Sequence, residues 1–195
     1  LQFSADSSQL LFTRDSQLLL LNIANKEIKA LTPEDHIINS PIWHCSKQET
    51  IITSIRDQAS WDLYKINIHS QARTKVAPGI ISIKSECHSG NYFATQAHSK
   101  GIVTLDNLFT PLSPDKLLPQ HYLSHSDEWA NTEQGIYFVN EGELYYSPHG
   151  ESQVESIASA GNLVGGINIV DDQLLLDVKK LNNSYIAKIP IKMAP

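Results

Sequence analysis

The sequence has little of what marks several common functional classes. Its 195 residues include two cysteines and one methionine, and its longest apolar run, Leu18–Leu21, is only strand-sized. Such a run is far shorter than the roughly 20 residues of a membrane-spanning helix. With 15 basic and 21 acidic residues the formal net charge is −6, and no lysine or arginine cluster stands out. Because a phosphate-tracking surface needs concentrated positive charge, this segment is not expected to contact nucleic acid.

Motifs for hydrolytic and nucleotide chemistry are also missing. The chain has no Gly-x-Ser-x-Gly elbow, no His-Glu-x-x-His zinc helix and no glycine-rich phosphate loop, since Gly165-Gly166 stands alone. A glycosidase with acids on separate strands stays open as an alternative. The first strands, however, offer mainly Ser, Ala, Cys and Asn. The sequence therefore predicts no catalytic residue, no metal site and no cofactor, and a protein that is not an enzyme.

What the sequence does contain is an internal repeat of about 40 residues. Five segments align without gaps in their first half; they begin at Phe3, Trp43, Ser85, Trp129 and Ile167. Each has a short strand, a polar turn, an apolar second strand and, after another turn, a third strand. A weaker fourth strand is visible in the first, second and fourth units. A period near 40 with this content is typical of a four-stranded β-propeller blade.

The repeat predicts an all-β fold, a β-propeller with about five four-stranded blades that forms one domain or part of a larger propeller. A β-sandwich is the alternative, although it does not require such self-similarity. The last unit stops after its third strand, which leaves an unpaired edge. Residues ahead of Leu1 are expected to supply the closing strand, or else another chain pairs with the open blade edge in self-association. The repeats cover about 1–40, 41–82, 83–126, 127–164 and 165–195.

Several short motifs resemble the blades of TolB-like propellers. Leu31-Thr32 resembles the end of such a blade, Pro41-Ile42-Trp43 its opening, and Asp62-Leu63-Tyr64 its third strand. Phe3–Ser7 resembles the Trp-Ser-Pro-Asp-Gly turn of the same family. The resemblance covers residues 1–78 and then weakens. The second unit has His-Cys-Ser-Lys where the family has Ser-Pro-Asp-Gly, and the third unit has serine in place of the tryptophan.

The resemblance implies a non-catalytic binding domain outside the cytoplasm, periplasmic in a bacterium, that contacts a protein partner or a small ligand. The chain is also similar to the C-terminal extracytoplasmic sensor of membrane-anchored winged-helix transcriptional regulators of the CadC/ToxR type. In that arrangement the membrane is reached only through a segment outside this chain. Two alternatives stay open: a periplasmic assembly scaffold like TolB, and the gating propeller of a prolyl oligopeptidase-like serine hydrolase. Fold-level likeness alone does not choose among them.

The two cysteines occupy equivalent places in neighbouring repeats. Cys45 and Cys87 each lie two residues after the start of the aligned segment. Adjacent blades bring such positions together, so a Cys45–Cys87 disulfide is conceivable if the Cα atoms lie within about 7 Å; two buried thiols are the alternative. The adjoining His44 and His88 suggest a zinc site with the cysteines. Neighbouring strand residues point to opposite faces, which disfavours that site.

Three residues are candidates for binding a partner or ligand. Trp61 precedes Asp62, is expected in a turn and is expected to be partly exposed, while His44 and His88 flank the cysteines. Trp43 and Trp129 occupy matching repeat positions and are expected in the blade core.

Overall fold

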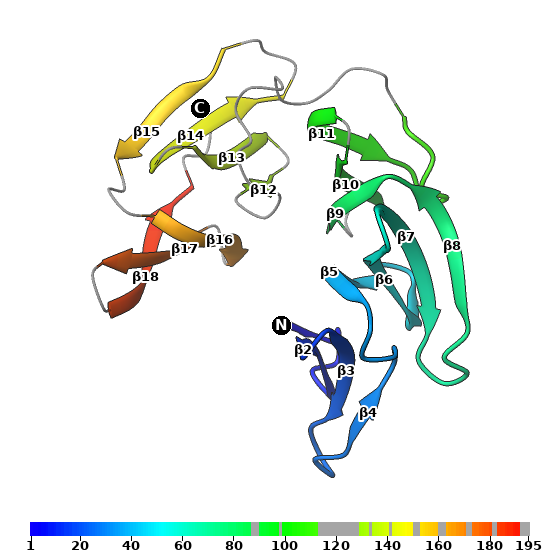
Figure 1. Cartoon of the computed structure of the whole chain (residues 1–195). Coiled ribbons are helices and arrows are strands. Elements are labelled where there is room, and N and C mark those ends of the chain that lie inside the picture. Colours follow the sequence, from blue (N-terminus) through cyan, green and yellow to red (C-terminus); the bar gives the residue numbers. More distant parts are fainter. Residues whose placement is uncertain are drawn as a thin grey trace. The chain divides into compact units, whose positions relative to one another are not determined.

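The computed structural model describes residues 1–86, 90–97, 99–112, 129–132, 134–140, 142–149, 153–159, 163–170, 173–180 and 183–191. Every regular element in these ranges is a β-strand (Figure 1). Nothing in the described part of the chain forms a helix long and apolar enough to span a membrane. The chain divides into two compact units, Leu1–Asp115 and Lys116–Pro195, and each is described by itself below.

The first unit consists of three antiparallel sheets, each built from consecutive strands. Its first two sheets have four strands in chain order, and its third has three. The first sheet contains β1 (Gln2–Phe3), β2 (Gln9–Arg14), β3 (Gln17–Asn22) and β4 (Ile28–Ala30). The second contains β5 (Ile37–His44), β6 (Lys47–Asp57), β7 (Ser60–Asn67) and β8 (Arg73–Pro78). The third contains β9 (Ile80–Glu86), β10 (Asn91–Gln96) and β11 (Ser99–Leu105).

The second unit repeats this topology in two sheets. One is four-stranded and contains β12 (Trp129–Asn131), β13 (Gly135–Asn140), β14 (Glu143–Pro148) and β15 (Glu155–Ser159). The other is three-stranded and contains β16 (Leu163–Val170), β17 (Gln173–Lys180) and β18 (Asn183–Pro190). Each predicted repeat therefore corresponds to one up-and-down sheet, which is the topology of a propeller blade.

The sheets begin somewhat earlier than the expected repeat limits. The second sheet starts at Ile37 rather than residue 41, and the third and fifth start at Ile80 and Leu163. The expected repeat limits depend on Trp43 and its equivalents, which lie inside these first strands rather than at their starts, so the limits place the residues ahead of them in the preceding repeat. The extent of the whole chain as one propeller domain stays a prediction.

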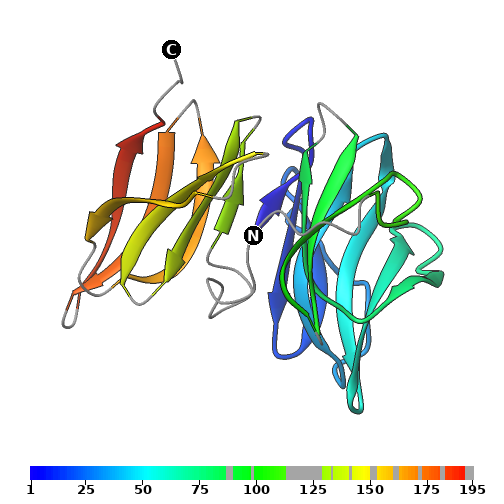
Figure 2. The same cartoon turned by 90° about the horizontal axis from the view of Figure 1, so that it is seen from above.

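The middle strands of the sheets are buried on both faces. Residues 51–55 of β6 and 135–139 of β13 are all buried, as expected for strands packed on both faces. One core lies between the first and second sheets, and it contains Leu11, Leu18, Leu20, Leu31, Ile51, Ile55, Ile66 and Ile68. Another lies between the second and third sheets, with Ile42, Ile52, Leu63, Ile83, Tyr92 and Phe109 among its members. In both cores the sheets pack face against face, and Figure 2 shows the strands of this unit side by side.

Hydrogen bonds between sheets also hold the first unit together. The Lys29 ammonium donates to the carbonyl of Ile68 at 2.7 Å, and Nε2 of Gln71 donates to the carbonyl of Ala30 at 2.7 Å. Nδ2 of Asn39 reaches the carbonyl of Ile81 in the third sheet at 3.0 Å. These bonds link successive sheets through backbone acceptors and fix their relative positions within the unit.

The Leu31-Thr32 motif closes the first sheet. Thr32 is buried, its Oγ1 accepts a hydrogen bond from the Leu18 N–H at 2.9 Å, and its carbonyl accepts one from Gln17 Nε2 at 2.8 Å. Leu31 belongs to the core between the first two sheets. The pair therefore anchors the connection after β4 by combining apolar burial with satisfaction of a buried backbone donor.

Replacing Thr32 with valine is expected to lower the unfolding free energy by about 1–3 kcal/mol, because the buried Leu18 N–H loses its acceptor. Chemical denaturation followed by tryptophan fluorescence would measure the loss. The control is Thr13→Val, since Thr13 is exposed on β2, and that variant should change stability by less than about 0.5 kcal/mol. Equal effects of the two substitutions would contradict the anchoring role of the Thr32 hydroxyl.

The Asp62-Leu63-Tyr64 motif lies in β7, where Asp62 is buried. Nζ of Lys75 on β8 lies 2.6 Å from Oδ2 of Asp62, and the Lys75 side chain is half exposed. This hydrogen bond to Asp62 raises the pKa of the Lys75 ammonium. The acid of the motif therefore has a structural partner on the neighbouring strand.

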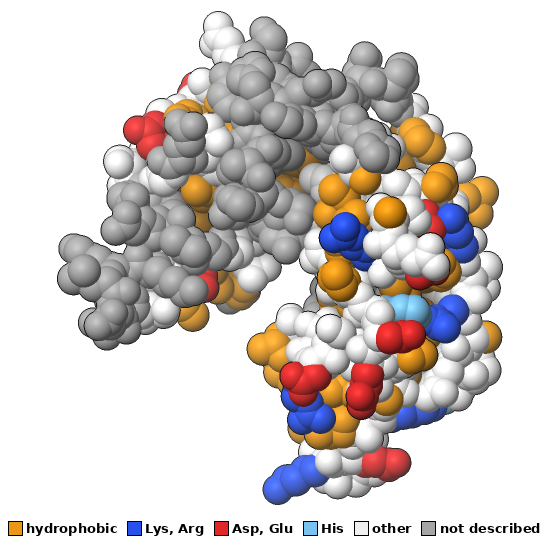
Figure 3. Space-filling model, in the orientation of Figure 1, with side chains coloured by type: hydrophobic (Ala, Val, Ile, Leu, Met, Phe, Trp, Pro, Cys, Tyr) orange, Lys and Arg blue, Asp and Glu red, His pale blue; other side chains and the backbone are white. Residues whose placement is uncertain are grey.

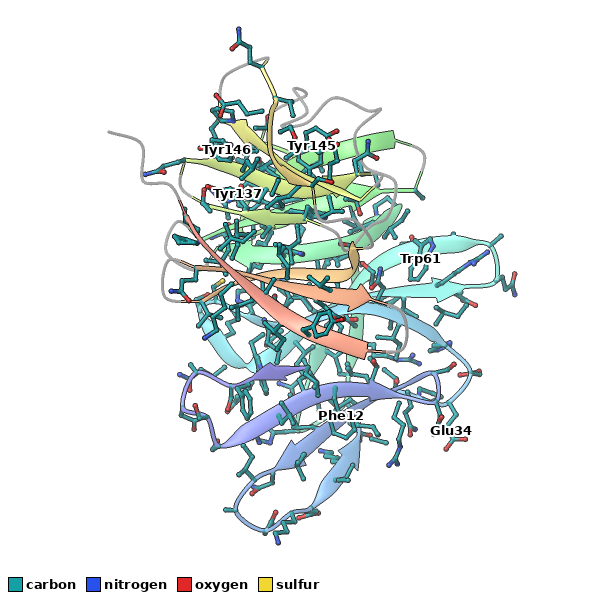
Figure 4. The ribbon with its side chains drawn as sticks, turned by 90° about the vertical axis from the view of Figure 1, so that its left-hand side faces the viewer. Phe12, Glu34, Trp61, Tyr137, Tyr145 and Tyr146 are labelled. Atoms are coloured by element: carbon teal, nitrogen blue, oxygen red, sulfur yellow. The ribbon has the colours of Figure 1, made fainter. Side chains whose placement is uncertain are left out.

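The core of the second unit is rich in aromatic rings. Tyr137 on β13 packs on Tyr146 of β14 with ring centroids 4.7 Å apart (Figure 4). Phe138 stacks on Tyr145 with ring centroids 5.4 Å apart. Trp129 is fully buried, as expected for a blade-core tryptophan, while Trp43 of the first unit is half buried against its core.

Candidate functional site

A pocket of about 220 Å³ lies where the β1–β2 turn of the first sheet meets the β5–β6 turn of the second. Its walls come from two segments that are distant in sequence, and the lining residues include Ser4, Asp6, Ser8, Gln9, Trp43, His44, Cys45 and Gln48. Trp43 is held against the first sheet because its backbone N–H donates to Oε1 of Gln2 at 2.9 Å. The pocket therefore combines a half-buried indole with polar turn residues.

Asp6 organises the turn on one side of this pocket. Its Oδ1 accepts hydrogen bonds from Oγ of Ser4 at 2.7 Å and from the N–H of Ser8 at 3.1 Å, and the Ser8 hydroxyl reaches both carboxylate oxygens. These bonds, led by the one from Ser4, lower the pKa of Asp6 to about 2. The carboxylate is ionised at neutral pH and is engaged in an Asx-type turn, so it shapes the pocket wall rather than serving as a general base.

His44 follows Trp43 at the end of β5, and its ring packs against residues of the third sheet and of the segment after it. A break in the pairing register between Trp43 and His44 separates the environments of the two rings. His44 is 5% exposed and lies edge-on to Tyr92 and Phe109, with ring centroids 6.0 and 6.4 Å apart. The N–H of Ser46 donates to Nδ1 of His44 at 3.2 Å, which places the remaining ring proton on Nε2 when the imidazole is neutral.

Two lysines share this environment. Nζ of Lys65 on β7 lies 4.8 Å from the centroid of the Phe109 ring. Burial lowers the pKa of Lys65, and the charge of Lys47 lowers it further. Burial likewise lowers the pKa of His44, with smaller effects from Lys65 and then Lys47. His44 is therefore kept neutral by its surroundings.

The neutral state of His44 should make the stability of the first unit depend on pH. Because the folded-state pKa is lowered, the unfolded chain binds the proton more readily, so the stabilisation is complete above the unfolded-state value of about 6.5 and is lost as the pH falls below it. Denaturation curves between pH 7.5 and 5 should show this loss, at most about 1.4 kcal/mol per pH unit from this group. In His44→Asn the slope over this range should be smaller; an unchanged slope would contradict the assignment.

Of the two predicted disulfide partners, only Cys45 belongs to the described residues. Cys45 lies next to this cluster and is disulfide-bonded, and its backbone N–H donates to the Tyr92 hydroxyl at 3.4 Å. Cys87 and His88 lie outside the described residues. The Cys45–Cys87 pairing and the binding role of His88 therefore stay predictions. Among the described residues no group of three or more His, Cys, Asp and Glu is placed to hold a metal ion.

Trp61 lies near the start of strand β7 and not in the turn that the sequence predicts. It pairs with Arg56 of β6, and its carbonyl accepts a hydrogen bond from the Gly79 N–H at 2.6 Å. Its side chain is half buried, and Figure 4 labels it on the β6–β7 hairpin. The strand extends to Ser60 because the β6–β7 hairpin pairs up to Asp57 and leaves only two residues in the turn.

The sequence singles out His44 and Cys45 but gives no signal for three residues that lie around them. Lys65, Tyr92 and Phe109 come from β7, from β10 and from the segment after β11. Only Tyr92 occupies the apolar second strand of a repeat, where it is indistinguishable from an ordinary core residue. No spacing in the sequence connects the three, because packing between two sheets brings them together.

The blade topology is matched by solved β-propeller structures. A chain of the nidogen–laminin complex superposes with a TM-score of 0.67 at 12% identity, covering 87% of this chain and 70% of that one. TolB from Acinetobacter baumannii also gives 0.67, at 13% identity, covering 95% of this chain and 51% of TolB. The tricorn protease gives 0.61 at 14% identity, covering 94% and 20% respectively. No protein-family model and no curated protein sequence matches the chain.

These similarities confirm the predicted fold class, because an all-β chain of up-and-down sheets superposes on propellers. At 12–14% identity they show the fold alone. This chain spans about half the length of the TolB chain and a fifth of the tricorn protease chain. The likeness to TolB supports the resemblance of the sequence motifs to TolB-like blades. It does not show what this protein binds or does.

Proposed function

We propose that this chain is a non-catalytic propeller domain that binds a protein partner or ligand through the end of its sheets that carries the β1–β2 and β5–β6 turns. The pocket between these turns is the observation that carries the proposal, because it joins Trp43 to polar groups from two sheets. Apolar or aromatic surface with a few convergent polar groups is typical of binding sites. Figure 3 shows acidic and basic side chains mixed over the face of the first unit that it presents, which suits a specific contact better than diffuse charge attraction.

The proposal places the domain outside the cytoplasm, as the sensor part of a membrane-anchored transcriptional regulator. The sequence resemblance to extracytoplasmic sensors supports this placement, and so does the disulfide at Cys45, since disulfides persist in oxidising compartments. A periplasmic assembly scaffold like TolB would share the same fold and compartment. The two roles differ in what a bound partner changes: a sensor alters transcription when the contact is lost, whereas a scaffold loses an assembled complex.

Site-specific photo-crosslinking in the source cells would test the binding surface. A photoreactive residue at Gln48 lies in the pocket wall near the start of β6. The matched control is Asp57, which is also exposed but lies at the far end of the same strand. A discrete adduct from position 48 that is absent from position 57 supports the proposal. Identical adducts from both positions, or none from position 48, would contradict it.

A further inference from the structure

Three basic side chains gather where the second sheet faces the third. His44 ends β5, Lys47 begins β6 and Lys65 lies in the middle of β7. Lys47 pairs with His44 across β5 and β6, and Lys65 lies over the Phe109 ring, whose centroid is 6.4 Å from that of His44. In keeping with this, the charges of Lys65 and Lys47 lower the pKa of His44, and that of Lys47 lowers the pKa of Lys65. Mutual repulsion of this kind destabilises the charged forms unless an anion lies among them.

This cluster differs from an ordinary solvated lysine face. Burial is the main cause of the lowered pKa of both His44 and Lys65, and the Lys65 ammonium lies over the Phe109 ring. The ion pairs found among the described residues use other basic groups; they are Arg14–Asp15, His36–Asp35, His69–Glu49 and Lys75–Asp62. Within the described ranges, then, no carboxylate neutralises the two lysines.

A neutral donor adjoins the cluster. The Tyr92 hydroxyl accepts a hydrogen bond from the Cys45 N–H, so its own proton is available for donation, and none of the described residues accepts it. The Tyr92 ring packs on Phe109 with centroids 4.8 Å apart, and Phe109 in turn lies under Lys65. The Lys65 ammonium and the His44 ring thus lie against the packed rings of Tyr92 and Phe109, and Lys47 pairs with His44 across β5 and β6. These residues supply two ammonium groups, a phenol O–H and the ring N–H of neutral His44. All four are donors, and two carry positive charge.

We infer that His44, Lys47, Lys65 and Tyr92 form a binding site for a carboxylate group. A carboxylate offers only acceptors and one negative charge, so it complements this set of donors and relieves the repulsion between the lysines. The carboxylate can belong to a small organic acid or to an acidic side chain or terminus of a peptide. The inference goes beyond the proposed partner contact and does not depend on it, because Lys65 and Tyr92 are not among the residues that line the pocket at Gln48.

Titration with succinate and with a glutamate-rich peptide, at constant ionic strength, would test the site. Imidazole NMR signals report directly on His44, and the His44→Asn spectrum assigns them. We expect saturable shifts, with affinity at least about tenfold weaker in Lys65→Met, which keeps the side-chain stem over Phe109. Lys188→Met is the matched control, because Lys188 is exposed on β18 of the other unit, and its affinity should equal that of the wild type.

The two ligands separate the sources of the carboxylate: saturation by succinate identifies a small-acid site, and saturation by the peptide alone identifies a peptide site. If Lys65→Met folds poorly, Lys47→Met at the exposed start of β6 provides the same comparison. Equal weakening by the Lys188 control, or shifts that never saturate with either ligand, would show general charge screening and overturn the inference. Photo-crosslinking from Gln48 measures the partner contact and the titration measures carboxylate binding, so failure of one proposal is distinguishable from failure of the other.

Discussion

The Gly135→Ala variant is expected to lose about 2–4 kcal/mol of unfolding free energy in the second unit, because overpacking against rigid atoms is costly. A Cβ at this position would overlap the backbone carbonyl oxygen of Ser147 and would lie 2.7 Å from Cε2 of Tyr146. Gly135 begins β13 opposite Pro148 of the adjacent strand β14, and the Tyr146 ring is fixed by its packing on Tyr137. Neither neighbour can move without disturbing the sheet.

The control for this variant is Gly166→Ala. Gly166 also lies in a strand, and a Cβ there would meet nothing within 4 Å. Its replacement should change stability by less than about 0.5 kcal/mol. Thermal unfolding followed by circular dichroism would compare the two variants with the wild type. Similar melting temperatures for Gly135→Ala and Gly166→Ala would mean that the Gly135 site relaxes easily and that the close approach is not a constraint on the fold.

The repeat period made most of the fold predictable. The strands expected at residues 10–12, 63–66 and 136–138 all lie inside observed strands, because a blade must alternate short strands and turns to bury its sheet on both faces. The strand starts were less predictable. Ile37 and Ile80 begin their strands well ahead of Trp43 and Ser85, where the self-similar segments begin, and nothing in the local sequence separates them from the preceding connection.

The candidate site was predictable only in part, because its residues come from segments that are far apart in the sequence. Cys45 and His44 could be singled out because matching repeat positions imply neighbouring places in adjacent blades. Lys65 and Phe109 could not be singled out. A lysine in the third strand of a repeat and an aromatic residue shortly after β11 are both ordinary in a blade. Their contact at 4.8 Å depends on how two sheets pack, which the repeat does not specify.

Removing the bridge predicted between Cys45 and Cys87 is expected to lower the unfolding free energy by about 3–4 kcal/mol, because it would release a loop of about 40 residues in the unfolded chain. These are the only two cysteines in the sequence, and Cys45 is disulfide-bonded. Denaturation of the wild type with and without reductant would measure the loss. The Cys45→Ser, Cys87→Ser double variant should match the reduced wild type and should not respond to reductant.

Thiol alkylation followed by intact-mass measurement decides whether the bridge exists in the native protein. If neither cysteine is alkylated under denaturing conditions until reductant is added, the second and third sheets are covalently joined beside His44 and Tyr92, and the placement in an oxidising compartment gains support. If both thiols of never-reduced protein react with the alkylating agent, the bridge is wrong. The first unit would then depend on its two cores and its backbone hydrogen bonds alone, and the extracytoplasmic placement would have only the sequence resemblance behind it.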